Sequence, residues 1–136
     1  MIIAAIDIGS NAARLLINKV IRRDNETLFS KLNLLRIPLK LGFDVFKNQT
    51  ISEEKTEMFI QTMSIFQDLM KLYHVDHYRA CATSAMRDAS NGKEILKKVK
   101  KELGMEIEII SGLEEAEILN ENHKSANLIS GEKQLF

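Results

Sequence analysis

The feature that most limits the fold is a pair of apolar runs at the start of the chain, separated by a short turn. Residues 2–8 are apolar except for Asp7, and residues 15–20 form a second run that is apolar except for Asn18 and Lys19. Runs of this length, bounded by turn residues, are typical of buried strands. The intervening residues 9–11, Gly-Ser-Asn, suit a tight hairpin because glycine and asparagine tolerate positive φ. The chain is therefore expected to begin with an antiparallel strand pair.

This turn has two interpretations. In the simpler one, Gly9, Ser10 and Asn11 only reverse the chain. In the other, Asp7 ends a buried strand beside a turn whose backbone N–H groups are free. Such a turn can hold phosphate oxygens, while the carboxylate orients a hydrated cation. The turn alone does not decide between these interpretations.

Composition limits the class of protein more than its function. The 136 residues correspond to one domain, or one domain with a short extension. Nineteen acidic and nineteen basic residues balance, so no global field indicates a nucleic-acid or membrane partner. The single cysteine, Cys81, excludes an internal disulfide and fits a reducing compartment, so a cytoplasmic location is expected by default.

The rest of the chain predicts alternating strands and helices. A stripe of methionine and aromatic residues at steps of three and four indicates a long amphipathic helix after the capping pattern at residues 50–53. The expected elements are a strand at 27–37, an ordered loop with room for a short helical turn at 39–49, the long helix to about residue 73, a strand at 77–83, a helix at 92–103, a strand at 105–110 and a helix from 111 onward. The predicted order is β-β-β-α-β-α-β-α.

This order predicts an α/β fold with a mixed five-stranded sheet and three main helices, in which right-handed crossovers place parallel strands beside the first strand. In such sheets, ligands gather beyond the carboxyl ends of the parallel strands. Three stretches are expected there together: residues 7–11, 83–87 and 111–115. Their coincidence favours the phosphate-binding interpretation of the first turn.

The second and third stretches offer charged groups that suit a phosphate site. The planar guanidinium of Arg87 matches phosphate oxygens, although an ion pair with Asp88 would equally explain it. Glu114 has capping-box spacing from Ser111, whereas Glu115 is not needed for the cap and is the better candidate for a general base. The lysines of residues 97–101 form a basic helix face, which is more typical of a solvated surface than of a functional one, although it could attract a polyanion.

Together these motifs closely resemble the N-terminal domain of the exopolyphosphatase / guanosine pentaphosphate phosphatase (Ppx/GppA) family. The resemblance rests on Ala-Ile-Asp-Ile-Gly-Ser-Asn at 5–11, Ala-Thr-Ser-Ala-Met-Arg at 82–87 and the Ile-Ser-Gly-Leu-Glu-Glu-Ala stretch at 110–116. It runs from about residue 2 to 120. The first and third motifs, in this order and at this separation, are specific together.

The resemblance implies an actin-like ATPase (ribonuclease H-like) fold in which two related domains close on a phosphate substrate. Gly9, Ser10 and Asn11 would belong to the first phosphate-binding loop, and Thr83 and Ser84 are further candidates for phosphate binding. Arg87 would contact the phosphate being cleaved. Glu115 would activate the attacking water, with a divalent cation, magnesium, offsetting charge, and Asp7 could hold that cation through water.

The resemblance also implies the substrate and the domain organisation. The reaction would be release of terminal orthophosphate from inorganic polyphosphate, guanosine pentaphosphate or both. Residues 1–123 would form the domain, with 124–136 a linker or the start of a second domain. The second phosphate loop of the family, Asp-x-Gly-Gly-Gly-Ser, is not in the sequence, so this chain alone is expected to be nearly inactive. A homodimer of the full-length protein is left open.

Two alternatives predict different behaviour. A kinase or other ATP-using protein of the same fold would bind ATP through its second domain. A non-catalytic module that senses a phosphorylated nucleotide would bind its ligand without releasing phosphate.

Overall fold

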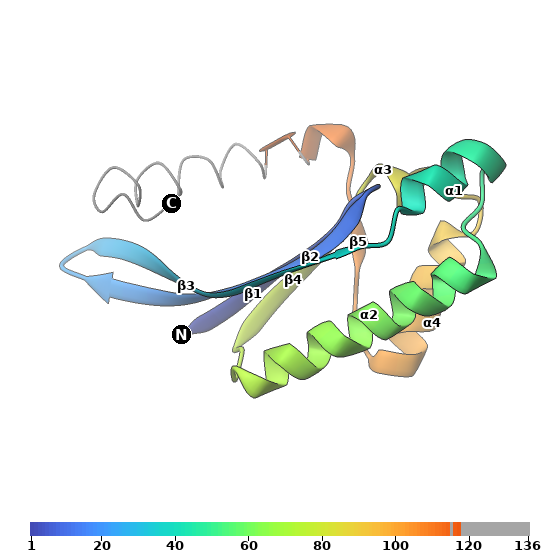
Figure 1. Ribbon diagram of the computed structural model, residues 1–136. Helices are drawn as coiled ribbons and strands as arrows, with labels where there is room; N and C mark the ends of the chain where they lie inside the picture. The colour runs from blue at the N-terminus through green and yellow to red at the C-terminus, as the bar shows by residue number, and fades with distance from the viewer. Residues whose placement is uncertain (115, 118–136) are drawn as a thin grey trace.

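The chain begins with an antiparallel meander of three strands. These are β1 (Ile2–Ile8), β2 (Ala12–Arg23) and β3 (Glu26–Pro38). The computed structural model describes residues 1–114, 116 and 117. The second strand is longer at both ends than the apolar run predicts, because its polar end pairs with β3 in a hairpin that extends past the rest of the sheet (Figure 1). Asp24 and Asn25, both at positive φ, form the turn of this hairpin.

Two parallel strands complete the sheet on the other side of β1. They are β4 (His77–Ala82) and β5 (Glu108–Ile109), and the strand order is β3-β2-β1-β4-β5. Both the β1–β4 and the β4–β5 pairings are parallel, while β1–β2 and β2–β3 are antiparallel. The predicted mixed sheet, with the meander on one side of the first strand and parallel strands on the other, is confirmed.

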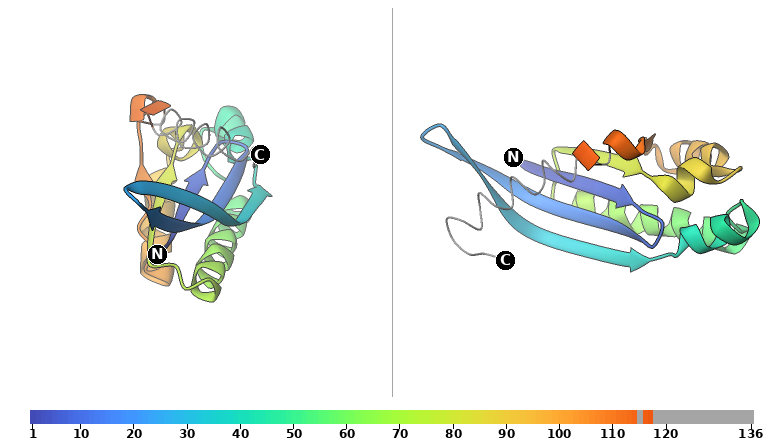
Figure 2. Two further views of the ribbon diagram at one scale, coloured as in Figure 1. Left: turned by 90° about the vertical axis from the view of Figure 1, so that its left-hand side faces the viewer. Right: turned by 90° about the horizontal axis from the view of Figure 1, so that it is seen from above.

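One face of the sheet is covered by α2 (Glu53–Leu72) and α4 (Gly92–Leu103), as Figures 1 and 2 show. The apolar stripe predicted for the long helix points into the core. Its members Phe59, Met63 and Phe66 are fully buried against the sheet residues. Burial of such large apolar side chains on a helix stripe and on alternate strand positions is what joins the two layers.

Two short helices lie at the carboxyl edge of the sheet. They are α1 (Leu41–Asn48), where an ordered loop with a short helical turn was expected, and α3 (Ser84–Asp88), which was not predicted. The sequence of α1 contains Gly42 and Asp44, which have low helix propensity, so its formation depends on tertiary contacts such as the burial of Leu41. The observed order is therefore β-β-β-α-α-β-α-α-β.

The boundaries of two other elements also differ from the prediction. The helix cap is Ser52, whose hydroxyl accepts from the Lys55 N–H, and not Thr50. The last strand is limited to Glu108–Ile109, because residues 104–107 diverge from β4. Helical residues follow at 112–114 and at 116–117, as the capping pattern predicts.

The predicted boundary at residue 123 and the expected linker at 124–136 lie outside the described residues. Within the described part of the chain, no helix is long and apolar enough to cross a bilayer.

Candidate phosphate site at the carboxyl edge of the sheet

The turn between β1 and β2 is narrow and leaves two backbone donors free. The Gly9 N–H donates to the Ala12 carbonyl at 3.0 Å, which closes the turn. Among the described residues, the N–H groups of Ser10 and Asn11 donate to no protein acceptor. Contrary to the expectation, neither Gly9 nor Asn11 has positive φ. Small residues in this turn therefore leave space around its backbone N–H donors. They are not needed to adopt a left-handed backbone conformation.

The chain segment before α1 holds this turn from one side. The Lys40 N–H donates to the Asn11 carbonyl and the Gly42 N–H to the Ser10 carbonyl, each at 2.8 Å. A Cβ atom on Gly42 would lie 2.7 Å from the Ser10 Cβ, so only glycine permits this approach. The carbonyls of the turn are thus satisfied while its N–H groups remain available.

The second predicted stretch meets the first through a pair of hydroxyls. Ser10 Oγ lies 2.7 Å from Ser84 Oγ, at the start of α3. Thr83 is buried, and its hydroxyl donates to the Ile8 carbonyl at 3.3 Å. The Thr83 hydroxyl therefore links the end of β4 to β1, and the Ser84 hydroxyl contacts the turn.

Arg87 connects the second stretch to the third. Its Nη1 donates to the Ile110 carbonyl at 2.9 Å, and its Nε lies 3.7 Å from Asp88 Oδ1. The side chain is 36% exposed. Since a guanidinium has five N–H donors, these contacts orient the group and leave donors for an anion. The ion pair that the sequence offers as the alternative explanation forms only loosely.

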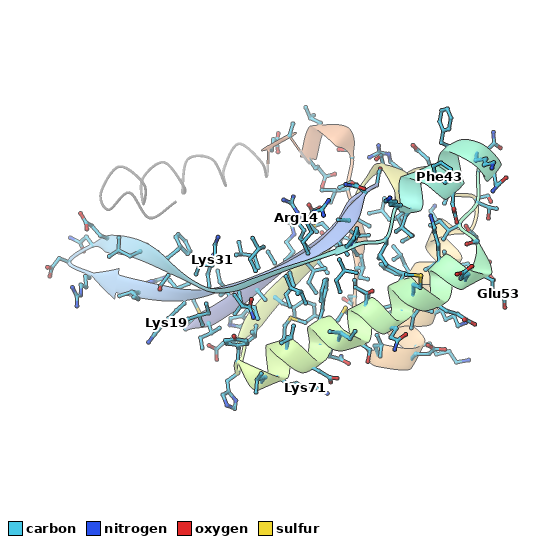
Figure 3. The ribbon with its side chains drawn as sticks, viewed as in Figure 1. Arg14, Lys19, Lys31, Phe43, Glu53 and Lys71 are labelled. Carbon is cyan, nitrogen blue, oxygen red and sulfur yellow. The ribbon has the colours of Figure 1, made fainter. Side chains whose placement is uncertain are left out.

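Asp7 is positioned at the same edge but is already paired. Its Oδ2 accepts from Arg14 Nη2 at 2.9 Å, and both side chains remain partly exposed. Figure 3 shows Arg14 on the sheet face opposite α2. Among the described residues, no group of three or more His, Cys, Asp or Glu side chains could hold a metal ion. Magnesium commonly uses one or two carboxylates, several waters and substrate phosphates. The single carboxylate fits a magnesium ion that arrives with a phosphate substrate, and does not form a metal site by itself.

The third stretch begins with the predicted cap. The Glu114 N–H donates to Ser111 Oγ at 3.1 Å, and Ser111 Oγ lies 3.4 Å from Glu114 Oε1. Ser111 therefore caps this helix as expected, and the Glu114 carboxylate accepts from the Ser111 hydroxyl instead of from the Ser111 N–H of a full capping box. Glu115, the candidate base, lies outside the described residues.

A lysine that the sequence analysis did not select also belongs to this edge. Lys40 lines a hollow of about 460 Å³ together with Ser10, Asn11, Gly42 and Phe43. Its ammonium has no ion pair among the described residues, and its backbone adopts φ 54°. The signal that could have indicated it was its position immediately before Leu-Gly in the segment 39–49, which was expected to be ordered. Phe43 is exposed on α1, where Figure 3 labels it.

Cys81 does not take part in this site. It is buried on β4, and burial raises the pKa of its thiol, with a smaller opposing effect of Arg79. A neutral, buried thiol is a poor nucleophile.

Comparisons with known proteins identify the family. The sequence profile of the Ppx/GppA phosphatase family matches residues 20–121. This chain belongs to the Ppx/GppA phosphatase family. Its described fold is the actin-like ATPase fold of the solved family members. The profile match includes the second and third motif stretches but begins after the first turn.

Individual relatives agree with this assignment. The crystal structure of the Ppx/GppA family member of Aquifex aeolicus is 32% identical, with a TM-score of 0.75 over 82% of this chain and 35% of that one. An exopolyphosphatase from Cytophaga hutchinsonii is 29% identical, with a TM-score of 0.77 over 86% of this chain and 36% of that one. A bifunctional 3-dehydroquinate synthase/phosphatase of Fusobacterium nucleatum is 38% identical over 85% of this chain.

The chain spans only part of each relative. It covers about a third of the two solved structures, at 35% and 36%, and 18% of the Fusobacterium protein. The family match at residues 20–121 contains Arg87 and the helix start at Ser111.

Proposed function

We propose that this chain is the N-terminal half of a hydrolase that releases terminal orthophosphate from inorganic polyphosphate, guanosine pentaphosphate or both. The observation that carries the proposal is the convergence of three loops at one sheet edge. The Ser10–Ser84 contact joins the first two, and the Arg87–Ile110 hydrogen bond joins the second to the third. Backbone N–H donors and a guanidinium that come together from separate segments can bind the oxygens of a phosphate group.

Each residue would have a defined part in the reaction. The N–H groups of Ser10 and Asn11 would donate to oxygens of the terminal phosphate, and Arg87 would neutralise charge that develops during cleavage. Glu115 would accept the proton of the attacking water. Phosphoryl transfer depends largely on positioning and electrostatic stabilisation, and these roles supply part of both.

A magnesium ion, when bound, would offset substrate charge beside Asp7. The chain's own residues would orient the phosphate and the water. A cytoplasmic location is part of the same proposal, and the single cysteine of the chain, which fits a reducing compartment, supports it.

The proposal is tested by direct binding of tripolyphosphate to the 136-residue chain, in the presence of magnesium, by isothermal titration calorimetry. We expect Arg87→Ala to weaken binding at least about tenfold, because loss of a charge-assisted donor pair is costly. Arg23→Ala is the matched control, because Arg23 is exposed at the far end of the β2–β3 hairpin. Equal affinity of the Arg87 variant and the parent would refute the proposed site.

A further inference from the structure

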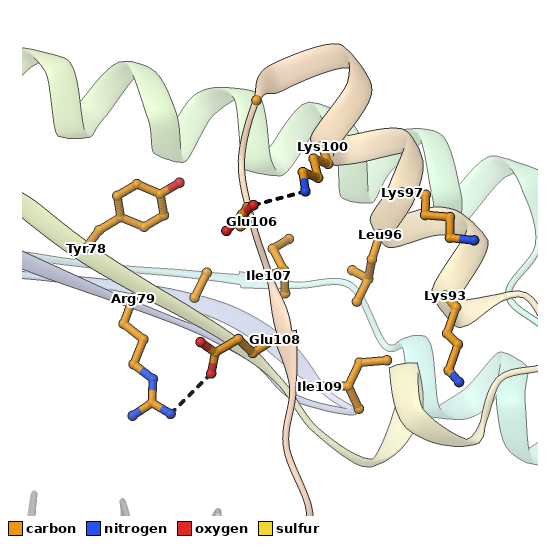
Figure 4. A pocket seen from close by; sticks show the side chains of 12 residues that line it. Tyr78, Arg79, Lys93, Leu96, Lys97, Lys100, Glu106, Ile107, Glu108 and Ile109 are labelled. Atoms are coloured by element: carbon orange, nitrogen blue, oxygen red, sulfur yellow. Dashed lines mark hydrogen bonds and ion pairs between the residues drawn. The ribbon is translucent and has the colours of Figure 1, made fainter.

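A second cavity lies away from this edge, between α4 and the last strand. Its volume is about 800 Å³, and Figure 4 shows its lining side chains. It opens where residues 104–107 diverge from β4, so the short length of β5 creates it. Leu96, Ile107 and Ile109 provide its apolar side. We call this cavity the α4 groove.

The charges along the α4 groove are mainly positive. Four cationic side chains line it, namely Arg79, Lys93, Lys97 and Lys100, against Glu106 and Glu108. Two of these cations are neutralised locally: Lys100 pairs with Glu106 at 3.0 Å, and Arg79 pairs with Glu108 at 3.3 Å. Lys93 and Lys97 have no ion pair among the described residues. The unbalanced charge of the groove therefore comes from these two exposed lysines.

The α4 groove adjoins the candidate phosphate site. In Figure 4, Lys100 and Glu106 lie at one end, and Lys93 and Ile109 at the other. Ile109 lines the groove, and the next residue, Ile110, accepts the hydrogen bond of Arg87. From Lys93 to Lys100 the helix rises by roughly 10 Å at 1.5 Å per residue. A linear anion that starts at Arg87 can thus continue past Lys93 and Lys97.

We propose that the α4 groove holds the distal phosphates of an inorganic polyphosphate chain whose terminal phosphate lies at Arg87. This inference rests on the proposed function and selects long polyphosphate as its substrate. Lysines that are spaced along a helix and border an apolar wall concentrate positive potential in the groove. A linear polyanion gains by releasing counterions when it binds such a row. Tripolyphosphate is too short to occupy both sites at once.

The test compares two matched double variants of the 136-residue chain. Lys93→Gln with Lys97→Gln removes the two unpaired charges of the groove. Lys98→Gln with Lys101→Gln removes the same charge from exposed positions of the same helix that do not line the groove. Glutamine has helix propensity close to that of lysine, so both should remain folded, and circular dichroism checks this. Lys93→Arg with Lys97→Arg retains the charges.

Fluorescence anisotropy of end-labelled polyphosphate gives the affinity for the long chain at low salt, and calorimetry gives it for tripolyphosphate. We expect the Lys93/Lys97 glutamine variant to bind long polyphosphate roughly fivefold more weakly or worse, with a smaller salt dependence. The Lys98/Lys101 variant should change by less than about twofold, because exposed charges outside the groove are screened. The arginine variant should bind like the parent, and tripolyphosphate affinity should not change in any of the three.

Three results distinguish failure of the α4 groove proposal from failure of the proposed function. Equal weakening by both glutamine variants would mean that only net charge matters, and would overturn the groove. Equal loss of tripolyphosphate and long-chain binding in the Lys93/Lys97 variant would also overturn it, because the groove would then not be a distal site. If Arg87→Ala leaves tripolyphosphate binding intact while the groove variant loses long-chain binding, the groove stands and the proposed function fails.

Discussion

Gly42 determines how closely the segment before α1 approaches the first turn. Because its added Cβ would lie 2.7 Å from the Ser10 Cβ and 3.2 Å from the Ser10 carbonyl oxygen, Gly42→Ala must displace the turn. We expect a loss of about 1–3 kcal/mol in the free energy of unfolding, typical of overpacking. Tripolyphosphate affinity should fall as well, since the N–H groups of Ser10 and Asn11 would move. Chemical denaturation and calorimetry measure the two effects.

The matched control for this substitution is Gly112→Ala. A Cβ on Gly112 would meet none of the described residues within 4 Å, so the substitution adds no clash with them. We expect its unfolding free energy to stay within about 0.5 kcal/mol of the parent. A Gly42 variant that is as stable as the Gly112 variant would show that the close approach to Ser10 is not required.

Asp44 gives the chain an acid-sensitive contact. Its pKa is lowered chiefly by the hydrogen bond from the Ser52 N–H, at 2.9 Å, and also by the Ser52 side chain and Lys55, although desolvation opposes this. A lowered folded-state pKa contributes stability above the unfolded value near 3.8, and this contribution is lost as the pH falls through the folded-state pKa. Asp44→Asn should therefore cost about 1–3 kcal/mol at pH 7.

Denaturation of the parent and the Asp44→Asn variant at several pH values tests this. The difference in unfolding free energy should be constant from pH 7 to about pH 5 and should shrink below the ordinary aspartate pKa. A difference that persists unchanged at the lowest pH would assign the effect to packing. The contact itself was not foreseen, because local spacing indicated Thr50 and Glu53 as the cap, whereas the carboxylate comes from α1.

Among the helices and strands, α2 illustrates what periodicity can predict. Its buried stripe was expected from the spacing of five residues, Phe59, Met63, Phe66, Met70 and Tyr73. The first four are buried, and Tyr73, at the C-cap, is partly buried. Phe66→Ala should lower the free energy of unfolding by about 3–5 kcal/mol, because it removes a fully buried aromatic ring and leaves a cavity. Ile65 is the adjacent control: it is 43% exposed, so Ile65→Ala should cost about 1 kcal/mol or less. Thermal denaturation ranks the stabilities of the two variants. Similar losses of stability would show that Phe66 does not lie on the buried face of α2.

Short elements could not be predicted in the same way. Strand β5 pairs only at Glu108 and Ile109, although the apolar pattern extends to Ile110. Helices α1 and α3 carry too few residues for a periodic signal, and both form where the chain packs against neighbouring loops. The order of the strands was predictable because right-handed crossovers leave few choices. The α4 groove is a consequence of the short β5. It depends on where the chain diverges from β4, which the local sequence pattern does not predict.

For the whole molecule, the candidate site was partly predictable. Chain order and the rule for parallel strands brought Ser10, Ser84 and Arg87 to one edge, and the structure joins them by hydrogen bonds. Lys40 was missed because its approach to Asn11 depends on the path of the segment after β3. The role of Glu115 stays a prediction, because it lies outside the described residues.

The proposed function has its sharpest consequence for catalysis. The described residues present donors to a phosphate from one side only, and the chain spans 36% of the Cytophaga hutchinsonii exopolyphosphatase. Stabilising the charge of phosphoryl transfer requires donors around all the equatorial oxygens. We therefore expect the 136-residue chain to bind tripolyphosphate but to release orthophosphate at the background rate in a colorimetric assay. Brisk release by the purified chain would contradict this expectation.

Activity should appear when residues 1–123 are followed by the remainder of the Aquifex aeolicus relative, which is 32% identical over the matched region. In this chimera, Glu115→Gln should lower kcat by at least about a hundredfold, because a glutamine cannot accept the proton of the attacking water. Glu114→Gln is the matched control, since glutamine also serves at the third position of a capping box, and its kcat should stay within about twofold of the parent. Normal turnover in the Glu115 variant, or equal loss in both, would remove Glu115 as the general base and leave Arg87 and the first turn as a phosphate-binding site without an assigned base.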